Sequence, residues 1–150
     1  MHTIVVGLDG SEGSLSALAF AIDEAKLRGA EIMAVSCWHV PSVVYEVGWT
    51  AAPIDTSEFP KIAERGLTEA LERAGVADSG VSVSSIVREG QAADVLCDVA
   101  AGADLLVVGS RGFGGFRGLM LGSVSQQCAQ HAPCPVVIIP RGQSDDAPES

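Results

Sequence analysis

Lysine is scarce in this sequence of 150 residues. Only Lys26 and Lys61 occur, and nine basic residues in all stand against nineteen acidic ones, which gives a formal net charge of −10. A nucleic-acid-binding domain usually presents a basic face, so this balance argues against a nucleic acid as partner. A polyanion bound by the second half of the chain must therefore be held by backbone N–H groups, arginines or a metal ion.

Long apolar runs are missing as well. Runs such as residues 105–108 and 136–139 stop after four positions, whereas a transmembrane helix needs roughly 18 consecutive apolar residues. The start does not resemble a signal peptide, because Met1-His2 is followed at once by a short apolar segment and then Gly-Leu-Asp-Gly. We therefore expect a cytoplasmic protein that does not enter a membrane.

The cysteines show no spacing that points to a bound metal or to a disulfide. They form no C-x-x-C pair and have no metal-ligand spacing relative to the three histidines. We expect four free, buried thiols in a reducing cytosol. These cysteines are Cys37, Cys97, Cys128 and Cys134.

What the sequence does have is a composition suited to one folded domain. The length is close to the commonest single-domain size, 47% of the residues are hydrophobic, and the mean hydropathy is +0.32, which argues against disorder. The polar residues 142–150 are the exception. We expect them to form a disordered tail behind a domain of residues 1–141.

Short β-branched runs alternate with longer segments of helical periodicity. The runs predict strands over residues 3–9, 31–38, 81–87, 104–109 and 135–140. Four helical segments lie between them. The first begins after Ser11 as a candidate N-cap and ends at Gly29, and the last begins at Gly122-Ser123. Residues 39–57, which contain prolines and mixed polar residues, predict a long loop.

Strands that alternate with helices form βαβ units, so the sequence predicts an α/β fold with a parallel sheet covered by helices on both faces. Right-handed crossovers leave doubly wound strand orders as the natural candidates. In such sheets ligands bind beyond the carboxyl ends of the strands, where the winding reverses. We therefore expect the functional site just after the first, second or fourth strand.

A glycine-rich stretch follows the fourth strand directly. Five glycines and two arginines lie between Gly109 and Gly118, and Gly122-Ser123 opens the last helix. Glycines let the backbone approach a ligand closely, and the free N–H groups of a helix start favour phosphate. The stretch fits neither the P-loop pattern nor the dinucleotide fingerprint that follows a first strand. Two interpretations stay open: an anion cradle, or a flexible connection in which Ser123 is a plain N-cap.

Several of these segments together resemble the universal stress protein family. The nucleotide motif of that family is Gly, two residues, Gly, nine residues, Gly and then Ser or Thr, and it stands here as Gly109-x2-Gly112-x9-Gly122-Ser123. The segments IVVGLDGSEGS, VREGQAADVL, DLLVVG and CPVVIIP also resemble the family. The resemblance covers residues 2–141. It implies a universal stress protein domain with a Rossmann-like, adenine nucleotide alpha-hydrolase-like sheet of strand order 3-2-1-4-5.

The resemblance also implies which residues contact a nucleotide. Asp9, at the end of the first strand, matches an aspartate beside the nucleotide and its metal ion, with the pinning of the turn into the first helix as the alternative role. Cys37 lies where the second strand offers backbone atoms to adenine, so its side chain need not react. The strand residues Gly7 and Val108 complete this side of the implied site.

The glycine motif supplies the rest of the implied site. The residues expected along the ribose and the phosphates are Gly109, Arg111 and Gly112. The residues expected to give N–H and hydroxyl donors to the phosphates are Gly122, Ser123, Val124 and Ser125. Arg111 and Arg117 supply the only basic charge that we expect near this loop.

The resemblance finally implies a function. It indicates a protein that binds ATP, or ADP or AMP, with Mg²⁺, that acts as a stress-response regulator or sensor, and that forms a homodimer through residues 135–140. Efficient hydrolysis is not predicted, because no motif places a general base and a water against the γ-phosphate. Two alternatives stay open: a slow ATPase that uses the same glycine-rich site, and a dimeric interaction protein that needs no nucleotide.

Overall fold

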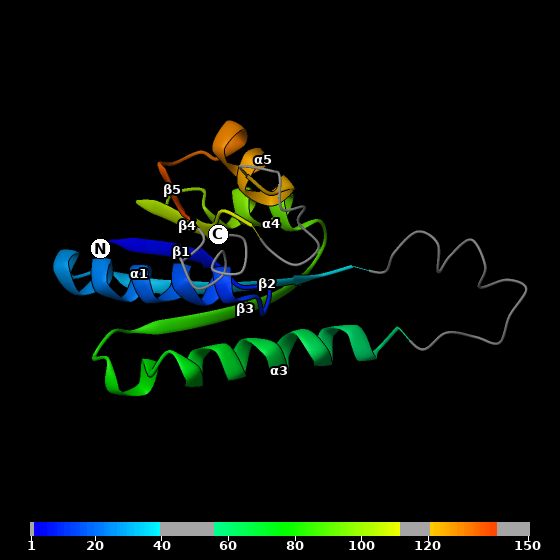
Figure 1. Cartoon of the computed structure of the whole chain (residues 1–150), viewed down its shortest axis with the longest axis horizontal. Coiled ribbons are helices and arrows are strands. Elements are labelled where there is room, and N and C mark those ends of the chain that lie inside the picture. Colours follow the sequence, from blue (N-terminus) through cyan, green and yellow to red (C-terminus); the bar gives the residue numbers. More distant parts are fainter. Residues whose placement is uncertain (1, 40–55, 112–120, 141–150) are drawn as a thin grey trace, which may run out of the picture.

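Five parallel strands form one sheet in the order β3-β2-β1-β4-β5 (Figure 1). The computed structural model describes residues 2–39, 56–111 and 121–140. The strands are β1 (Thr3–Gly7), β2 (Glu31–Trp38), β3 (Val83–Glu89), β4 (Leu105–Gly109) and β5 (Val136–Ile139). Every neighbouring pair is parallel, which confirms the parallel sheet that the sequence pattern predicts, and the strand order is the one that the family resemblance implies.

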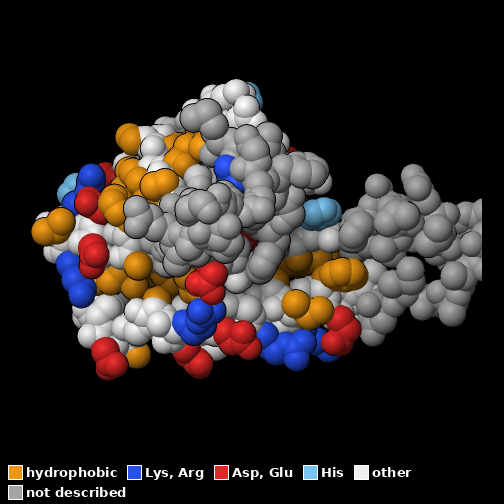
Figure 2. All heavy atoms as spheres, viewed as in Figure 1, with side chains coloured by type: hydrophobic (Ala, Val, Ile, Leu, Met, Phe, Trp, Pro, Cys, Tyr) orange, Lys and Arg blue, Asp and Glu red, His pale blue; other side chains and the backbone are white. Residues whose placement is uncertain are grey.

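Helices cover both faces of this sheet (Figure 1). Helices α1 (Glu12–Arg28) and α3 (Glu58–Arg73) lie on one face, and α4 (Ala92–Val99) and α5 (Ser123–His131) lie on the other. A short 3₁₀ helix, η1 (Val76–Asp78), follows α3. On the face shown in Figure 2, acidic and basic side chains lie interspersed along α3.

The predicted limits of the first helix are confirmed. The side chain of Ser11 accepts a hydrogen bond from the backbone N–H of Ser14 at the start of α1. Gly29 ends the helix with φ at 65°, a left-handed conformation that glycine adopts without steric cost.

Each face of the sheet carries its own apolar core, and β1 contributes to both. Ile4 and Val6 belong to the core beneath α1 and α3, whereas Val5 belongs to the core beneath α4 and α5. None of the three is more than 1% exposed. A strand buried on both faces has no polar side, which is why this segment is continuously apolar rather than alternating.

Two strands differ from their predicted bounds by more than one residue at an end. The first ends at Gly7 rather than at residue 9, because Asp9 already belongs to the turn that caps α1. The third spans Val83–Glu89 rather than 81–87, and its pairing with β2 continues to Glu89 opposite Trp38. The apolar periodicity of the sequence ends at residue 87, two residues before the pairing does. The reason is that an edge strand can form its backbone hydrogen bonds without apolar side chains.

Some expectations concern segments that the structure leaves undescribed. The polar tail of residues 142–150 and all of the predicted loop over 39–57 except residues 39, 56 and 57 lie outside the described residues. The same holds for Gly112 and Arg117 of the glycine-rich stretch. Within the described ranges, none of the helices has the length and apolar character that a membrane crossing requires.

The expectation of four buried thiols is wrong in part. All four cysteines are free, but only Cys128 is buried, while Cys37, Cys97 and Cys134 are half-buried. The three half-buried cysteines pack at the margin of the core beneath α4 and α5 rather than inside it.

Candidate functional site

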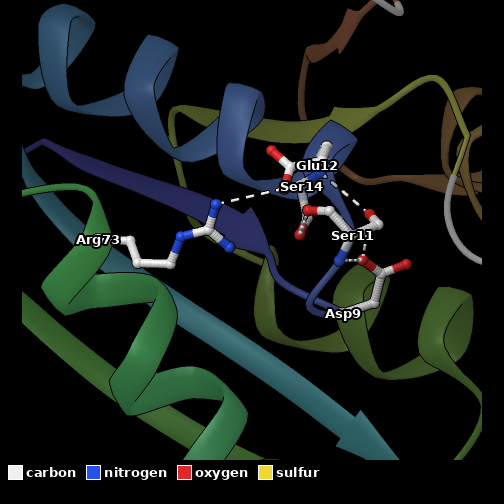
Figure 3. A network of polar contacts seen from close by, with 5 residues as sticks. All are labelled: Asp9, Ser11, Glu12, Ser14 and Arg73. Carbon is white, nitrogen blue, oxygen red and sulfur yellow. Dashed lines mark hydrogen bonds and ion pairs between the residues drawn. The ribbon is translucent and has the colours of Figure 1, made fainter. Parts of the chain in front are cut away.

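The turn between β1 and α1 is built on the carboxylate of Asp9. Its Oδ1 accepts a hydrogen bond from the backbone N–H of Ser11 at 2.9 Å and another from the Ser11 hydroxyl at 2.5 Å (Figure 3). The Ser11 oxygen in turn accepts from the N–H of Ser14 at 3.2 Å, which caps the helix. The second oxygen of Asp9 takes no part in this network and points away from it (Figure 3). Asp9 therefore pins the turn with one oxygen and leaves the other to face solvent or a ligand.

The first turn of α1 packs backbone to backbone against the end of β4. A Cβ atom added to Gly13 would lie 2.7 Å from the carbonyl oxygen of Arg111, and one added to Gly109 would lie 2.8 Å from the carbonyl carbon and oxygen of Gly13. Contacts this short require that both positions stay without a side chain. The sequence motif indicates Gly109 but not Gly13. The available signal for Gly13 is its place inside a helix, where alanine is more favourable by roughly 1 kcal/mol.

Helix α5 begins close to the end of β4, and Ser110 joins the two elements. Its carbonyl oxygen accepts hydrogen bonds from the N–H of Gly122 at 2.6 Å and from the hydroxyl of Ser125 at 2.8 Å. Ser125 is buried, and its hydroxyl also lies 3.1 Å from the carbonyl oxygen of Gly122. The expected hydroxyl donation from Ser125 to a ligand is therefore corrected: this proton is used within the fold. A ligand contact through the Ser125 backbone N–H stays a prediction.

The start of α5 offers backbone donors for which the described residues outside the helix supply no acceptor. The N-cap is Gly122 rather than Ser123, with φ at −76° and ψ at 170°, and a glycine has no side chain with which to cap a helix. The N–H groups of Ser123, Val124 and Ser125 belong to the first turn, where an α-helix supplies no acceptor. Ser123 is exposed and Val124 is half-buried. A helix start of this kind attracts anions.

Arg111 brings a positive charge next to this helix start, since it directly follows Ser110. Its side-chain Nε is buried and has no hydrogen-bond partner within the part of the chain that the structure describes. A buried donor that lacks an acceptor costs about 1–3 kcal/mol. The position therefore favours an added acceptor, and an anion satisfies both the N–H group and the charge.

Three of the expected site residues take part in the core beneath α4 and α5. A Cβ added to Gly7 would lie 2.9 Å from Cδ1 of Leu96, so Gly7 makes room for α4. Val108 is buried in the same core. Cys37 packs against it, and burial raises the pKa of the Cys37 thiol to about 11, an effect that Arg88 offsets only in part. The thiol therefore stays protonated at neutral pH. Nucleotide contacts of Gly7, Val108 and Cys37 stay predictions.

A further basic side chain reaches α1 from α3. Nη2 of Arg73 lies 3.3 Å from Oε1 of Glu12, and both side chains are exposed (Figure 3). Such an exposed pair stabilises the fold by about 0–1 kcal/mol at most. Its main effect is on charge, because it places a cation beside Glu12, which follows Asp9 by three residues in the sequence. The sequence does not reveal this pair, because residues 61 apart in the chain leave no local pattern. That Arg111 and Arg117 supply the only basic charge near the glycine-rich loop stays a prediction, since residues 112–120 lie outside the described residues.

The carboxyl ends of β1 and β4 thus bring together the Asp9 turn, the Gly13–Gly109 contact, Arg111 and the start of α5. Cys37 lies on the neighbouring strand, two residues beyond Val35, which is the partner of Gly7. Across residues 2–39, 56–111 and 121–140, no group of three or more His, Cys, Asp or Glu side chains is arranged to hold a metal ion.

Comparison with known proteins agrees with this architecture. The sequence profile of the Universal stress protein family matches residues 1–140. The chain belongs to the universal stress protein family. A universal stress protein of Mycobacterium tuberculosis is 39% identical over 135 residues, which cover 90% of this chain and 44% of the relative. Another, of Mycolicibacterium smegmatis, is 37% identical over 136 residues, 91% of this chain and 45% of the relative. The chain therefore spans less than half the length of these two universal stress proteins.

Solved structures of universal stress proteins share the fold. One in complex with cAMP is 27% identical, with a TM-score of 0.69 over 92% of this chain and 96% of that one. One from Archaeoglobus fulgidus in complex with dAMP is 22% identical, with a TM-score of 0.70 over 93% and 98%. One from Arabidopsis thaliana with AMP bound is 20% identical, with a TM-score of 0.63 over 97% and 95%. At their identities, the last two show a common fold alone.

Proposed function

We propose that this universal stress protein domain binds an adenine nucleotide, ATP or else ADP or AMP, and that it acts as a stress-response regulator or sensor. The buried, unpartnered Nε of Arg111 carries the proposal. It lies one residue from Ser110, whose carbonyl oxygen holds the uncapped start of α5. One phosphate group would satisfy both features. Three universal stress proteins of the same fold are complexes with cAMP, dAMP and AMP, which supports an adenine nucleotide as ligand.

Each part of the nucleotide has a proposed partner. The phosphate oxygens accept hydrogen bonds from the backbone N–H groups of Ser123, Val124 and Ser125. They also accept from the Ser123 hydroxyl and from the Arg111 guanidinium. Adenine meets the backbone of β2 near Cys37. Asp9 has one carboxylate oxygen outside the turn network, and it would share Mg²⁺ with phosphate oxygens and water, the coordination that this ion favours.

Binding without rapid turnover fits the site best. Oδ1 of Asp9 already accepts two hydrogen bonds from Ser11. That oxygen is engaged in the turn, and the sequence carries no motif that places a general base and a water against a γ-phosphate. The slow ATPase alternative predicts phosphate release that Arg111→Gln or Ser123→Ala abolishes, and a phosphate-release assay run beside the binding titration distinguishes the two functions.

The domain is proposed to act as a homodimer through β5. Among the described residues this strand pairs only with β4, and its four residues are half-buried. The carbonyl groups of Pro135 and Ile139 accept from β4, so the backbone groups of Val136 and Ile138 point away from the sheet. An apolar edge strand needs a cover, and a second copy related by a two-fold axis is a common one.

Titration with ATP tests the nucleotide proposal. Arg111→Gln and Ser123→Ala should each weaken binding about 10- to 150-fold, the equivalent of one charge-assisted hydrogen bond of roughly 1.5–3 kcal/mol. Arg28→Gln is the matched control, because it removes the same charge from the far end of α1, where Arg28 pairs with Glu24 at 2.9 Å. If Arg111→Gln binds ATP as tightly as Arg28→Gln does, the proposal is wrong.

A further inference from the structure

The groups that are expected to meet a phosphate come from two different elements of the fold. Arg111 lies two residues beyond the end of β4, whereas the backbone N–H groups belong to the first turn of α5. Among the described residues, the hydrogen bonds that join these two places end on the carbonyl oxygen of Ser110, the residue before Arg111. One phosphate can use both groups at full strength only if they are held in a fixed relative position before it binds.

The hydroxyl of Ser125 makes one of these hydrogen bonds to Ser110, at 2.8 Å, and the N–H of Gly122 makes the other, at 2.6 Å. Ser125 is 2% exposed, so water does not compete for its hydroxyl. The carbonyl oxygen of Gly122, 3.1 Å from that hydroxyl, already accepts from the N–H of Gln126 at 3.0 Å. Since a hydroxyl has one proton to donate, the shorter contact, with Ser110, is the bond that joins α5 to the end of β4.

Apolar packing alone does not fix the direction in which α5 begins. Cys128 holds the helix on the core beneath α4 and α5, but apolar contact is non-directional. A hydrogen bond weakens as its angle departs from linearity, so the Ser125 bond restricts how the first turn is oriented relative to Ser110, and thus to Arg111. If this bond is lost, the carbonyl oxygen of Ser110 keeps the N–H of Gly122 as a partner, so the fold should tolerate the change.

We infer that Ser125 is a positioning residue for the phosphate site. Through the carbonyl oxygen of Ser110, its hydroxyl holds the first turn of α5 where one phosphate meets both the helix N–H groups and Arg111. This role needs no contact between the hydroxyl and the ligand. The inference rests on the proposed function, since it requires a ligand that carries phosphate at this site.

Titration of the full chain with ATP and with adenosine tests this role. Ser125→Ala keeps the backbone N–H and removes only the hydroxyl. It should weaken ATP binding about 3- to 12-fold, the equivalent of one neutral hydrogen bond, and should leave adenosine binding unchanged, because adenosine has no phosphate. Ser125→Thr should bind ATP like the wild type, since a threonine hydroxyl can turn toward the carbonyl group three residues earlier, the orientation that the Ser125 hydroxyl has.

Ser79→Ala is the matched control. The Ser79 hydroxyl also donates to a carbonyl oxygen three residues earlier, that of Val76 at 2.7 Å, and Ser79 is half-buried. It lies just before β3, at the amino ends of the strands, whereas the candidate site lies at their carboxyl ends. This variant should lower the free energy of unfolding and leave the affinity for ATP unchanged. Urea unfolding gives the stability of both alanine variants.

A double-mutant cycle with Arg111→Gln separates positioning from a general structural role. If the Ser125 hydroxyl aligns α5 with Arg111, its loss matters only while Arg111 is present. In the Arg111→Gln protein, Ser125→Ala should therefore weaken ATP binding by less than about 1.5-fold.

Three outcomes overturn the inference while the proposed function stands. The first is a Ser125→Ala protein that binds ATP like the wild type although Arg111→Gln binds it weakly. The second is a loss in Ser125→Ala that is as large for adenosine as for ATP. The third is a loss of the same size with and without Arg111. If neither Arg111→Gln nor Ser125→Ala weakens ATP binding, the proposed function fails and the inference fails with it.

Discussion

A methyl group placed on Gly109 would stand 2.8 Å from the carbonyl oxygen of Gly13. The contact joins the end of β4 to the first turn of α1, two elements that are far apart in the sequence. Arg111 follows Gly109 by two residues, and its carbonyl oxygen touches the same turn. The pair of glycines therefore sets where the chain leaves the sheet toward the candidate nucleotide site.

Gly13→Ala should destabilise the domain. The added Cβ would lie 2.7 Å from a backbone oxygen, and backbone cannot move aside as a flexible side chain can, so we expect a loss of about 1–3 kcal/mol in the free energy of unfolding. Gly66→Ala is the matched control, because Gly66 lies within α3 and a Cβ there meets nothing within 4 Å. It should stabilise by up to about 1 kcal/mol. Urea unfolding measures both, and equal shifts would contradict the contact.

Gly122→Val should abolish nucleotide binding and leave the fold intact. With φ at −76° and ψ at 170°, Gly122 has a backbone conformation that valine adopts readily. The new side chain would instead fill the space at the start of α5 where a phosphate is expected. ATP titration with circular dichroism checks this. A folded variant that binds ATP like the wild type would remove the start of α5 from the site.

Asp9→Asn should weaken ATP binding more than adenosine binding, and EDTA should do the same to the wild type. Asparagine keeps an oxygen that can accept from Ser11, so the turn is preserved while the charge for Mg²⁺ is lost. Repulsion between like charges a few ångströms apart is worth about 1 kcal/mol even in water, and only the phosphates of ATP experience it. Calorimetry measures the affinity for both ligands, and an equal loss of affinity for ATP and adenosine would refute a metal at Asp9.

Ile138→Pro should dissociate the proposed dimer. Proline removes an N–H group that points away from β4 and therefore costs no hydrogen bond within the sheet. Ile138→Ala is the control, since it shortens the same side chain and keeps the N–H. Lysine at Val137 or Ile139 is a poorer test, because both side chains pack into the core beneath α1. Sedimentation at micromolar concentration gives the answer, and a monomeric wild type would rule out the dimer.

Acid should weaken the fold at the amino ends of β1 and β4, where Asp104 contacts the start of the chain. The backbone N–H of Thr3 donates to Oδ2 of Asp104 at 2.8 Å, and Nδ1 of His2 lies 3.3 Å from Oδ1. The Thr3 bond first, and His2 second, hold the pKa of Asp104 below its usual value. The folded pKa is thus lower than the unfolded one, so the stabilisation is complete above about pH 3.9 and is lost as the pH falls through the folded pKa.

Asp104→Asn should accordingly flatten the acid dependence of the free energy of unfolding. Urea unfolding from about pH 5 down to pH 2 measures this dependence. His2→Ala should retain most of it, because the larger cause, the Thr3 bond, remains. An acid dependence in Asp104→Asn as steep as that of the wild type would show that other carboxylates govern this range.

Local patterns predict the elements of this fold well. The buried run of β1 and the caps at Ser11 and Gly29 each depend on a few adjacent residues, so they can be derived from the sequence. Contacts between distant elements cannot be derived in this way. Neither the approach of Gly13 to Gly109 nor the ion pair of Arg73 follows from the residues beside it.

The candidate site shows the same division. The sequence motif points to Arg111 and to the start of α5, and the structure places these next to one another. The motif does not reveal that the Ser125 hydroxyl donates to the carbonyl oxygen of Ser110, because this bond depends on how the end of β4 packs against α5. Which donors stay available to a ligand is a property of packing, and packing requires the three-dimensional structure.

The carbonyl oxygen of Ser110 fastens the start of α5 through both Gly122 and Ser125. Helix α5 is therefore anchored to the sheet by Ser110, Gly122 and Ser125, which lie on either side of positions 112–120 in the sequence. In evolutionary terms, this anchor constrains three positions that are not adjacent in the sequence. A substitution at Ser110, Gly122 or Ser125 that removes one of these hydrogen bonds should disturb where α5 begins.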